Sequence, residues 1–83
     1  MELIVSGSTS GDNMYTLKNI ANSIKSIKIL SGKATLVGDM GSSITNIDAL
    51  SASKLTIDGE MNIENLKAKD VIIKGKVIIQ NLS

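Results

Sequence analysis

The last third of the chain repeats itself, and this repeat constrains the fold more than any other feature. Residues 50–65 (LSASKLTIDGEMNIEN) align without a gap on residues 66–81 (LKAKDVIIKGKVIIQN), a spacing of 16 residues. Both copies alternate aliphatic and other residues around a fixed glycine, Gly59 in the first and Gly75 in the second. So short a repeat is typical of the coils of a β-solenoid, in which each coil must stack on a neighbour to bury its apolar side.

A shorter signature extends this pattern toward the N-terminus. It consists of an apolar residue, any residue, an aliphatic residue, any residue and then glycine. Alternation places the two apolar side chains on one face of a strand, and the glycine permits the positive φ of a tight corner. Four segments carry the signature: Leu3-Val5-Gly7, Ala34-Leu36-Gly38, Leu55-Ile57-Gly59 and Val71-Ile73-Gly75.

The segments between these copies predict insertions. Residues 13–27 follow an apolar period of three to four residues, which predicts a helix capped by Asp12 or Asn13. The alternative is that the isoleucines at the end of this segment and just after it, Ile24, Ile27 and Ile29, already belong to a strand. Residues 41–49 (GSSITNIDA) are expected to form a loop or a short extra turn.

The fold expected from these patterns is mainly β, with short solenoid coils and one N-terminal helical insertion at about residues 13–27. We expect a single domain over residues 1–83, with a strand and a helix cap over 1–33 and the repeat coils over 34–83. Hydrophobic residues make up 42% of the chain, but Tyr15 is its one aromatic residue, so the core must be built from aliphatic layers.

Stacking the two repeat copies in register places opposite charges side by side. The pairs are Lys54 with Asp70, Asp58 with Lys74, and Glu60 with Lys76. Exposed cross-strand pairs contribute only about 0.2–1 kcal/mol each, so they select the register more than they stabilise the fold. Three complementary pairs in one alignment favour parallel coils stacked in register.

The same alignment shows an apolar anomaly in the final copy. Outward Thr56 becomes Ile72 and outward Asn62 becomes Ile78, so the last coil is apolar on both faces. One interpretation is that a preceding segment, such as the candidate helix, covers the second face. The other is a self-association surface, because an uncapped solenoid end offers unpaired backbone to another chain. The second interpretation assigns that contact to Val71, Ile72, Ile73, Val77, Ile78, Ile79 and Leu82.

The composition argues against several classes of function. The chain has no histidine and no cysteine, the commonest general base and the thiol nucleophile, so we expect no enzyme, metal site or cofactor. A net charge of +1 with no arginine predicts no nucleic-acid binding. Apolar runs are too short to cross a bilayer, and the N-terminus lacks a signal sequence, so we expect a cytoplasmic protein.

A polar loop near the N-terminus is the candidate ligand or partner site. It lies between the first expected strand and the candidate helix, whose backbone amides could hold an anion. The residues concerned are Ser8, Thr9, Ser10, Gly11, Asp12 and Asn13.

Residues 50–82 resemble the bactofilins, polymer-forming bacterial cytoskeletal proteins. The resemblance rests on a cadence of alternating aliphatic residues and a glycine, present here as Ala68, Val71, Ile73, Gly75 and Val77. It implies a right-handed β-helix that joins end to end through apolar terminal coils into filaments without bound nucleotide.

Two functional hypotheses follow. The first is a non-catalytic structural or assembly protein that associates with itself, as a homo-oligomer or a filament, through its apolar last coil. The alternative is a small binding or inhibitor protein of a phage or mobile element. Such a protein would engage a host protein, or sequester a small ligand, through the polar loop and residues 41–49.

Overall fold

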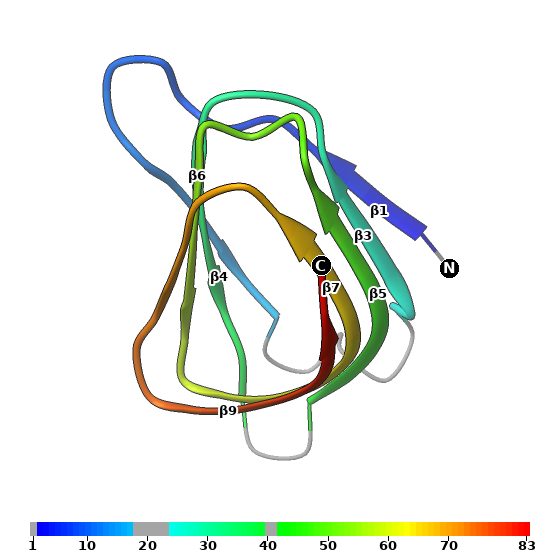
Figure 1. Cartoon of the computed structure of the whole chain (residues 1–83). Coiled ribbons are helices and arrows are strands. Elements are labelled where there is room, and N and C mark those ends of the chain that lie inside the picture. Colours follow the sequence, from blue (N-terminus) through cyan, green and yellow to red (C-terminus); the bar gives the residue numbers. More distant parts are fainter. Residues whose placement is uncertain (1, 18–23, 40–41) are drawn as a thin grey trace.

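The chain folds into a parallel β-solenoid of about four turns, here as a computed structural model that describes residues 2–17, 24–39 and 42–83. Successive strands alternate between two sheets, so the chain winds around one apolar interior (Figure 1). Sheet A has the order β1-β3-β5-β7-β9, with the bounds Glu2–Val5, Ser26–Ile29, Ser43–Ala49, Glu60–Ala68 and Lys76–Leu82. Sheet B has the order β2-β4-β6-β8, with the bounds Asn13–Thr16, Lys33–Val37, Lys54–Asp58 and Val71–Ile73.

The repeat predicts the pairing of the last rungs correctly. Leu55 pairs with Val71 and Ile57 with Ile73, the spacing of 16 residues read from the sequence. Glu60 pairs with Lys76 in the neighbouring sheet, as the charge alignment requires. All named strand pairs are parallel and in register, so the expected solenoid is confirmed.

Three of the four signature copies stack on one another in sheet B. Their glycines form a column at the corner that follows each strand, and Gly59 and Gly75 have φ of 80° and 95°. A Cβ on Gly59 would overlap the carbonyl oxygen of Gly38, and one on Gly75 would overlap that of Gly59. The first copy is different, because Leu3 and Val5 lie on β1 in sheet A.

The predicted helix at 13–27 is not present in the described part of this segment. Residues 13–16 form β2 and Ser26–Ile29 form β3, while residues 18–23 lie outside the described residues. The neighbouring rungs explain the difference, since β4 and β5 offer free edges whose amides and carbonyls these residues satisfy. The alternative prediction is confirmed for Ile27 and Ile29, and Ile24 is buried just before β3.

The loop or short extra turn expected at 41–49 is not found over residues 43–49, which form β5, the middle strand of sheet A. Ile44 and Ile47 both point into the core, although they are three residues apart. Simple alternation is therefore broken once, and both Thr45 and Asn46 donate their N–H to the carbonyl of Lys25. Gly41 lies outside the described residues.

A column of asparagines follows this irregularity from rung to rung. Asn46 pairs with Asn65, and Asn65 with Asn81. The Asn65 amide donates to the side-chain oxygen of Asn46 at 3.1 Å, and the Asn81 amide donates to the carbonyl of Glu64 at 3.2 Å. These side chains thus bridge successive rungs where the long strands depart from regular alternation.

Candidate functional site: the C-terminal rung

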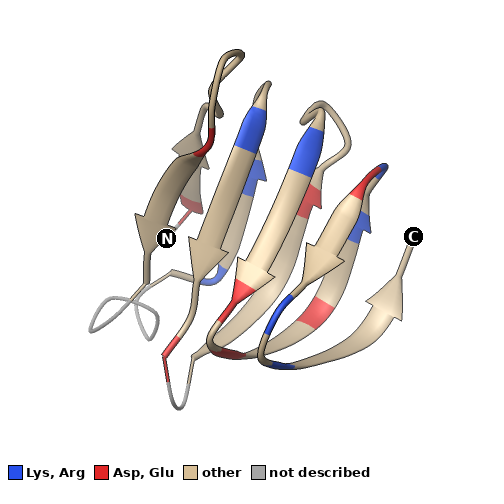
Figure 2. Cartoon of the chain, turned by 90° about the vertical axis from the view of Figure 1, so that its left-hand side faces the viewer, with Lys and Arg blue, Asp and Glu red and all other residues tan. Residues whose placement is uncertain are grey.

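The last rung of the solenoid has a neighbour on one side only. Strands β8 and β9 are the C-terminal edge strands of their sheets (Figure 2). Lys74 donates its N–H to the carbonyl of Ile57 at 2.7 Å, and Ser83 donates to the carbonyl of Leu66 at 2.9 Å. Because adjacent residues of a strand direct their amides to opposite sides, Ile73 and Leu82 present theirs at the free edge.

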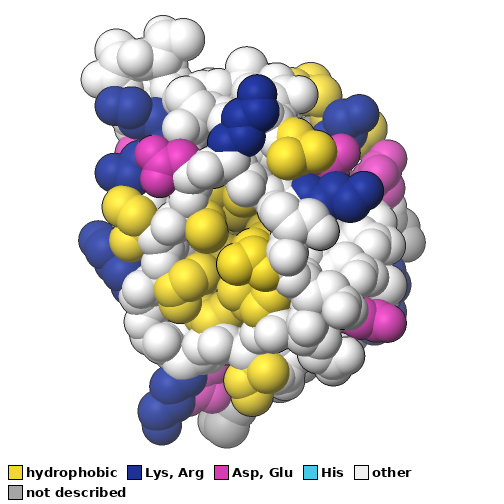
Figure 3. Space-filling model, viewed as in Figure 1, with side chains coloured by type: hydrophobic (Ala, Val, Ile, Leu, Met, Phe, Trp, Pro, Cys, Tyr) yellow, Lys and Arg dark blue, Asp and Glu magenta, His cyan; other side chains and the backbone are white. Residues whose placement is uncertain are grey.

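The inward side chains of this rung are exposed although their counterparts one rung earlier are buried. Ile57 is 0% exposed and its partner Ile73 is 41% exposed. Leu66 is likewise 0% exposed and its partner Leu82 is 62% exposed. Equivalent apolar side chains are thus buried where another rung follows and exposed where none does. In Figure 3 an apolar patch lies in the centre of this end face, surrounded by polar atoms. The inward residues at this end are Val71, Ile73, Val77, Ile79 and Leu82.

Val77 and Ile79 on β9 remain half-buried and pack against the core.

The outward isoleucines of the last rung lie on the solvent side of each sheet. Ile72 pairs with Thr56 and is 37% exposed, while Ile78 pairs with Asn62 and is 63% exposed. The described parts of residues 13–27 do not cover them, because β2 and β3 lie toward the opposite end of the sheets, as Figure 2 illustrates. The structure thus brings all seven residues of the predicted self-association set onto one rung.

The predicted loop site is largely occupied by its own contacts. The Ser8 hydroxyl accepts the N–H of Gly11 at 3.0 Å and that of Ser10 at 3.3 Å. Asp12 accepts the hydroxyl of Thr35 at 3.0 Å, and the Asn13 amide donates to the carbonyl of Ser6 at 3.0 Å. Thr9 is exposed at the tip. The loop leads into β2 and not into a helix, so the expected anion site at a helix start is absent from these residues.

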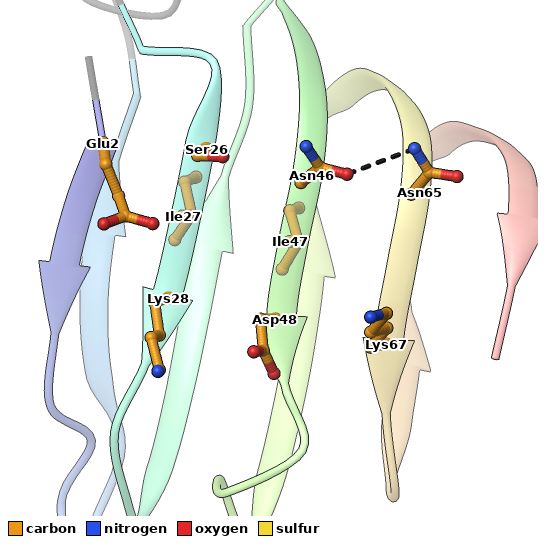
Figure 4. Close-up of a pocket in the computed structure, with 9 residues that line it drawn as sticks. All are labelled: Glu2, Ser26, Ile27, Lys28, Asn46, Ile47, Asp48, Asn65 and Lys67. Atoms are coloured by element: carbon orange, nitrogen blue, oxygen red, sulfur yellow. Dashed lines mark hydrogen bonds between the residues drawn. The ribbon is translucent and has the colours of Figure 1, made fainter.

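The outer face of sheet A carries a shallow hollow that sequence reasoning missed (Figure 4). Its volume is about 240 Å³, and its polar lining includes Asn46, Asn65 and a row of alternating charge, Lys28, Asp48 and Lys67. The identity of Asn65 and Asn81 in the repeat was the available signal for its asparagine column. The hollow offers hydrogen-bond donors and acceptors, with carboxylates and lysines as its titratable side chains.

Within residues 2–17, 24–39 and 42–83, no group of three or more acidic, histidine or cysteine side chains is placed to hold a metal ion. Among those residues, no helix is long and apolar enough to cross a membrane.

Comparison with known proteins gives no relative. No protein family, no curated protein and no solved structure matches the chain. The solenoid of about four turns is compatible with a β-helix resemblance, and nothing links it to the bactofilins in particular.

Proposed function

We propose that this chain is a non-catalytic structural or assembly protein that associates with itself through its C-terminal rung. The observation that carries the proposal is the contrast between equivalent residues. Ile57 and Leu66 are fully buried, whereas Ile73 and Leu82, which continue the same rows, are 41% and 62% exposed. A second chain placed on this face would bury side chains that already form one layer of a core.

Burial of the inward side chains of this rung would favour association and supply part of the free energy that association needs. Full burial of an isoleucine or leucine stabilises by about 1.5–3 kcal/mol, so covering the exposed part of Ile73 and Leu82 contributes on the order of 2 kcal/mol. The half-buried residues of the rung add to this. Pairing the free edges of β8 and β9 would satisfy their backbone groups without water.

The alternative, a small phage or mobile-element protein that binds a host protein or a ligand, has weaker support. Ser8, Asp12 and Asn13 are engaged in contacts within the chain, and residues 43–49 are held in the middle of sheet A. These segments present fewer free groups to a partner than the last rung does.

The test replaces the outward isoleucines with the residues of the preceding rung, Ile72→Thr and Ile78→Asn. Thr56 and Asn62 already occupy these positions in a folded rung, so the double variant should fold. Sedimentation velocity over a wide concentration range should show the unchanged protein as associating and the variant as mainly monomeric. The matched control is Leu50→Thr, which removes a side chain of similar exposure, 41%, from the turn after β5.

Three results would contradict the proposal. The unchanged chain could stay monomeric at every concentration, or the control could dissociate the assembly as fully as the double variant. Loss of the β-sheet circular dichroism signal in the double variant would show that Ile72 and Ile78 belong to the core.

A further inference from the structure

We propose that the partner of the C-terminal end face is the N-terminal end of a second copy, so that copies join head to tail. This inference rests on the proposed self-association and specifies its geometry. The N-terminal end consists of β1 and β2, the first strands of sheets A and B (Figure 2). The alternative arrangement, in which two C-terminal ends meet across a two-fold axis, would leave this end unused.

Exposed apolar residues mark the N-terminal end as well as the C-terminal one. Met14 on β2 is 68% exposed and Ile4 on β1 is 55% exposed. Both point outward, since their neighbours Leu3, Val5 and Tyr15 pack against the core. These two side chains give the N-terminal end exposed apolar surface.

In the two outward rows that contain Met14 and Ile4, apolar residues occur in the terminal rungs alone, although Leu30 and Leu50 are exposed elsewhere. Along sheet B, Met14 pairs with Thr35, Thr35 with Thr56, and Thr56 with Ile72. The inner two rungs thus carry threonine, and the first and last rungs carry methionine and isoleucine. Along sheet A, Ile4 begins a row whose next three residues are charged: Lys28, Asp48 and Lys67. Head-to-tail stacking places the apolar residues of both ends in one junction.

The charges of the two ends are opposite. Residues 2–17 contain Glu2 and Asp12 and no lysine, a formal charge of −2. Residues 69–83 contain three lysines, Lys69, Lys74 and Lys76, against the single acid Asp70, a formal charge of +2. Contact between unlike ends joins −2 to +2, whereas contact between two C-terminal ends joins +2 to +2. Charge complementarity therefore selects the head-to-tail arrangement.

The free strand edges have the matching hydrogen-bond phase. Val5 accepts the N–H of Leu30 at 2.9 Å, so its neighbour Ile4 directs its amide to the free edge of β1. At the C-terminal end the residues that point to the free edge are the inward ones, such as Leu82. In a parallel pair with aligned inward rows, one strand offers the amides and carbonyls of its inward residues and the other strand those of its outward residues. The pairs β1–β3 and β7–β9 within the chain have this arrangement. A head-to-tail copy thus repeats the pairing that the chain already uses.

The experiment mixes two variants, each with one end blocked. Met14→Lys blocks the N-terminal end, because its row is buried wherever a rung lies on both sides, at Thr35 and Thr56. Ile73→Lys with Leu82→Lys blocks the C-terminal end. All three side chains are between 41% and 68% exposed, so both variants should keep their β-sheet circular dichroism. Burying a lysine in a junction should weaken association roughly a hundred-fold. Each variant alone should then be monomeric, and an equimolar mixture should form a species of twice the 8.7 kDa chain mass.

The outcomes separate this inference from the proposed function. If the variant blocked at its N-terminal end associates as strongly as the unchanged chain, the head-to-tail arrangement is wrong while self-association stands. If the mixture stays monomeric although the unchanged chain associates, the arrangement is likewise wrong. If the unchanged chain never associates, both proposals fail.

Association should also weaken as salt rises to about 0.15 M, and strengthening would contradict the charge argument. Should the C-terminal double variant unfold, Leu82→Lys alone serves as the blocked chain.

Discussion

The column of glycines predicts that Gly59→Ala destabilises the fold far more than its small size suggests. Gly59 has φ of 80°, a region that an L side chain adopts at a cost of about 1–2 kcal/mol. A Cβ there would also overlap the Gly38 carbonyl oxygen, and relieving such an overlap in a packed backbone costs about 1–3 kcal/mol. The expected loss in the free energy of unfolding is therefore about 2–5 kcal/mol.

Urea denaturation followed by circular dichroism measures this loss, and the chain supplies its own control. The nearest atom to a Cβ on Gly11 is the Ser8 hydroxyl oxygen at 3.8 Å, and Gly11 does not have a positive φ. Gly11→Ala should therefore change the free energy of unfolding by less than about 1 kcal/mol, and in the stabilising direction. Equal effects of Gly59→Ala and Gly11→Ala would refute the reasoning, because the corner would then accept a side chain.

Two further substitutions test the interior and the asparagine column by the same denaturation assay. Ile57→Ala should lower the free energy of unfolding by about 2–5 kcal/mol, because Ile57 is fully buried between two rungs. A loss as small as that of the exposed Leu50→Ala would contradict the placement of Ile57 in the core. Asn65→Ala should cost about 1 kcal/mol through its lost hydrogen bonds to Asn46 and the Thr45 carbonyl. An equal loss for Asn62→Ala, an exposed residue on the same strand, would show that the column contributes nothing specific.

The last two rungs could be predicted from the sequence because the repeat there is compact. Between Leu55 and Val71 no insertion disturbs the spacing, so alternation, glycine and charge all specify one register. The seven residues of the candidate site were found in the same way, by comparing the last copy with the one before it. Their solvent exposure could not be read from the alignment, since it depends on whether any other segment reaches that end of the sheets.

The earlier rungs were harder because their segments are ambiguous by themselves. Isoleucines three or four residues apart in residues 13–27 fit an amphipathic helix, and they equally fit strands separated by a connection. Residues 41–49 separate two copies of the signature, which led to the expectation of a loop or a short extra turn. Over residues 43–49 the structure has a strand in which Ile44 and Ile47 break the regular alternation. A break of this kind becomes recognisable only when Asn46 is seen beside Asn65 in the next rung.

The class of architecture and the pairing of the last rungs follow from the amino-acid sequence alone. A short alternating repeat with a fixed glycine cannot bury its apolar residues alone, so it must stack. The tertiary structure decided which of the remaining segments became strands, because a backbone segment takes the partners that its neighbours offer. It also decided that the last rung is paired on one side only. Burial is a property of the whole stack, and identical side chains such as Ile57 and Ile73 are core in one rung and surface in the next.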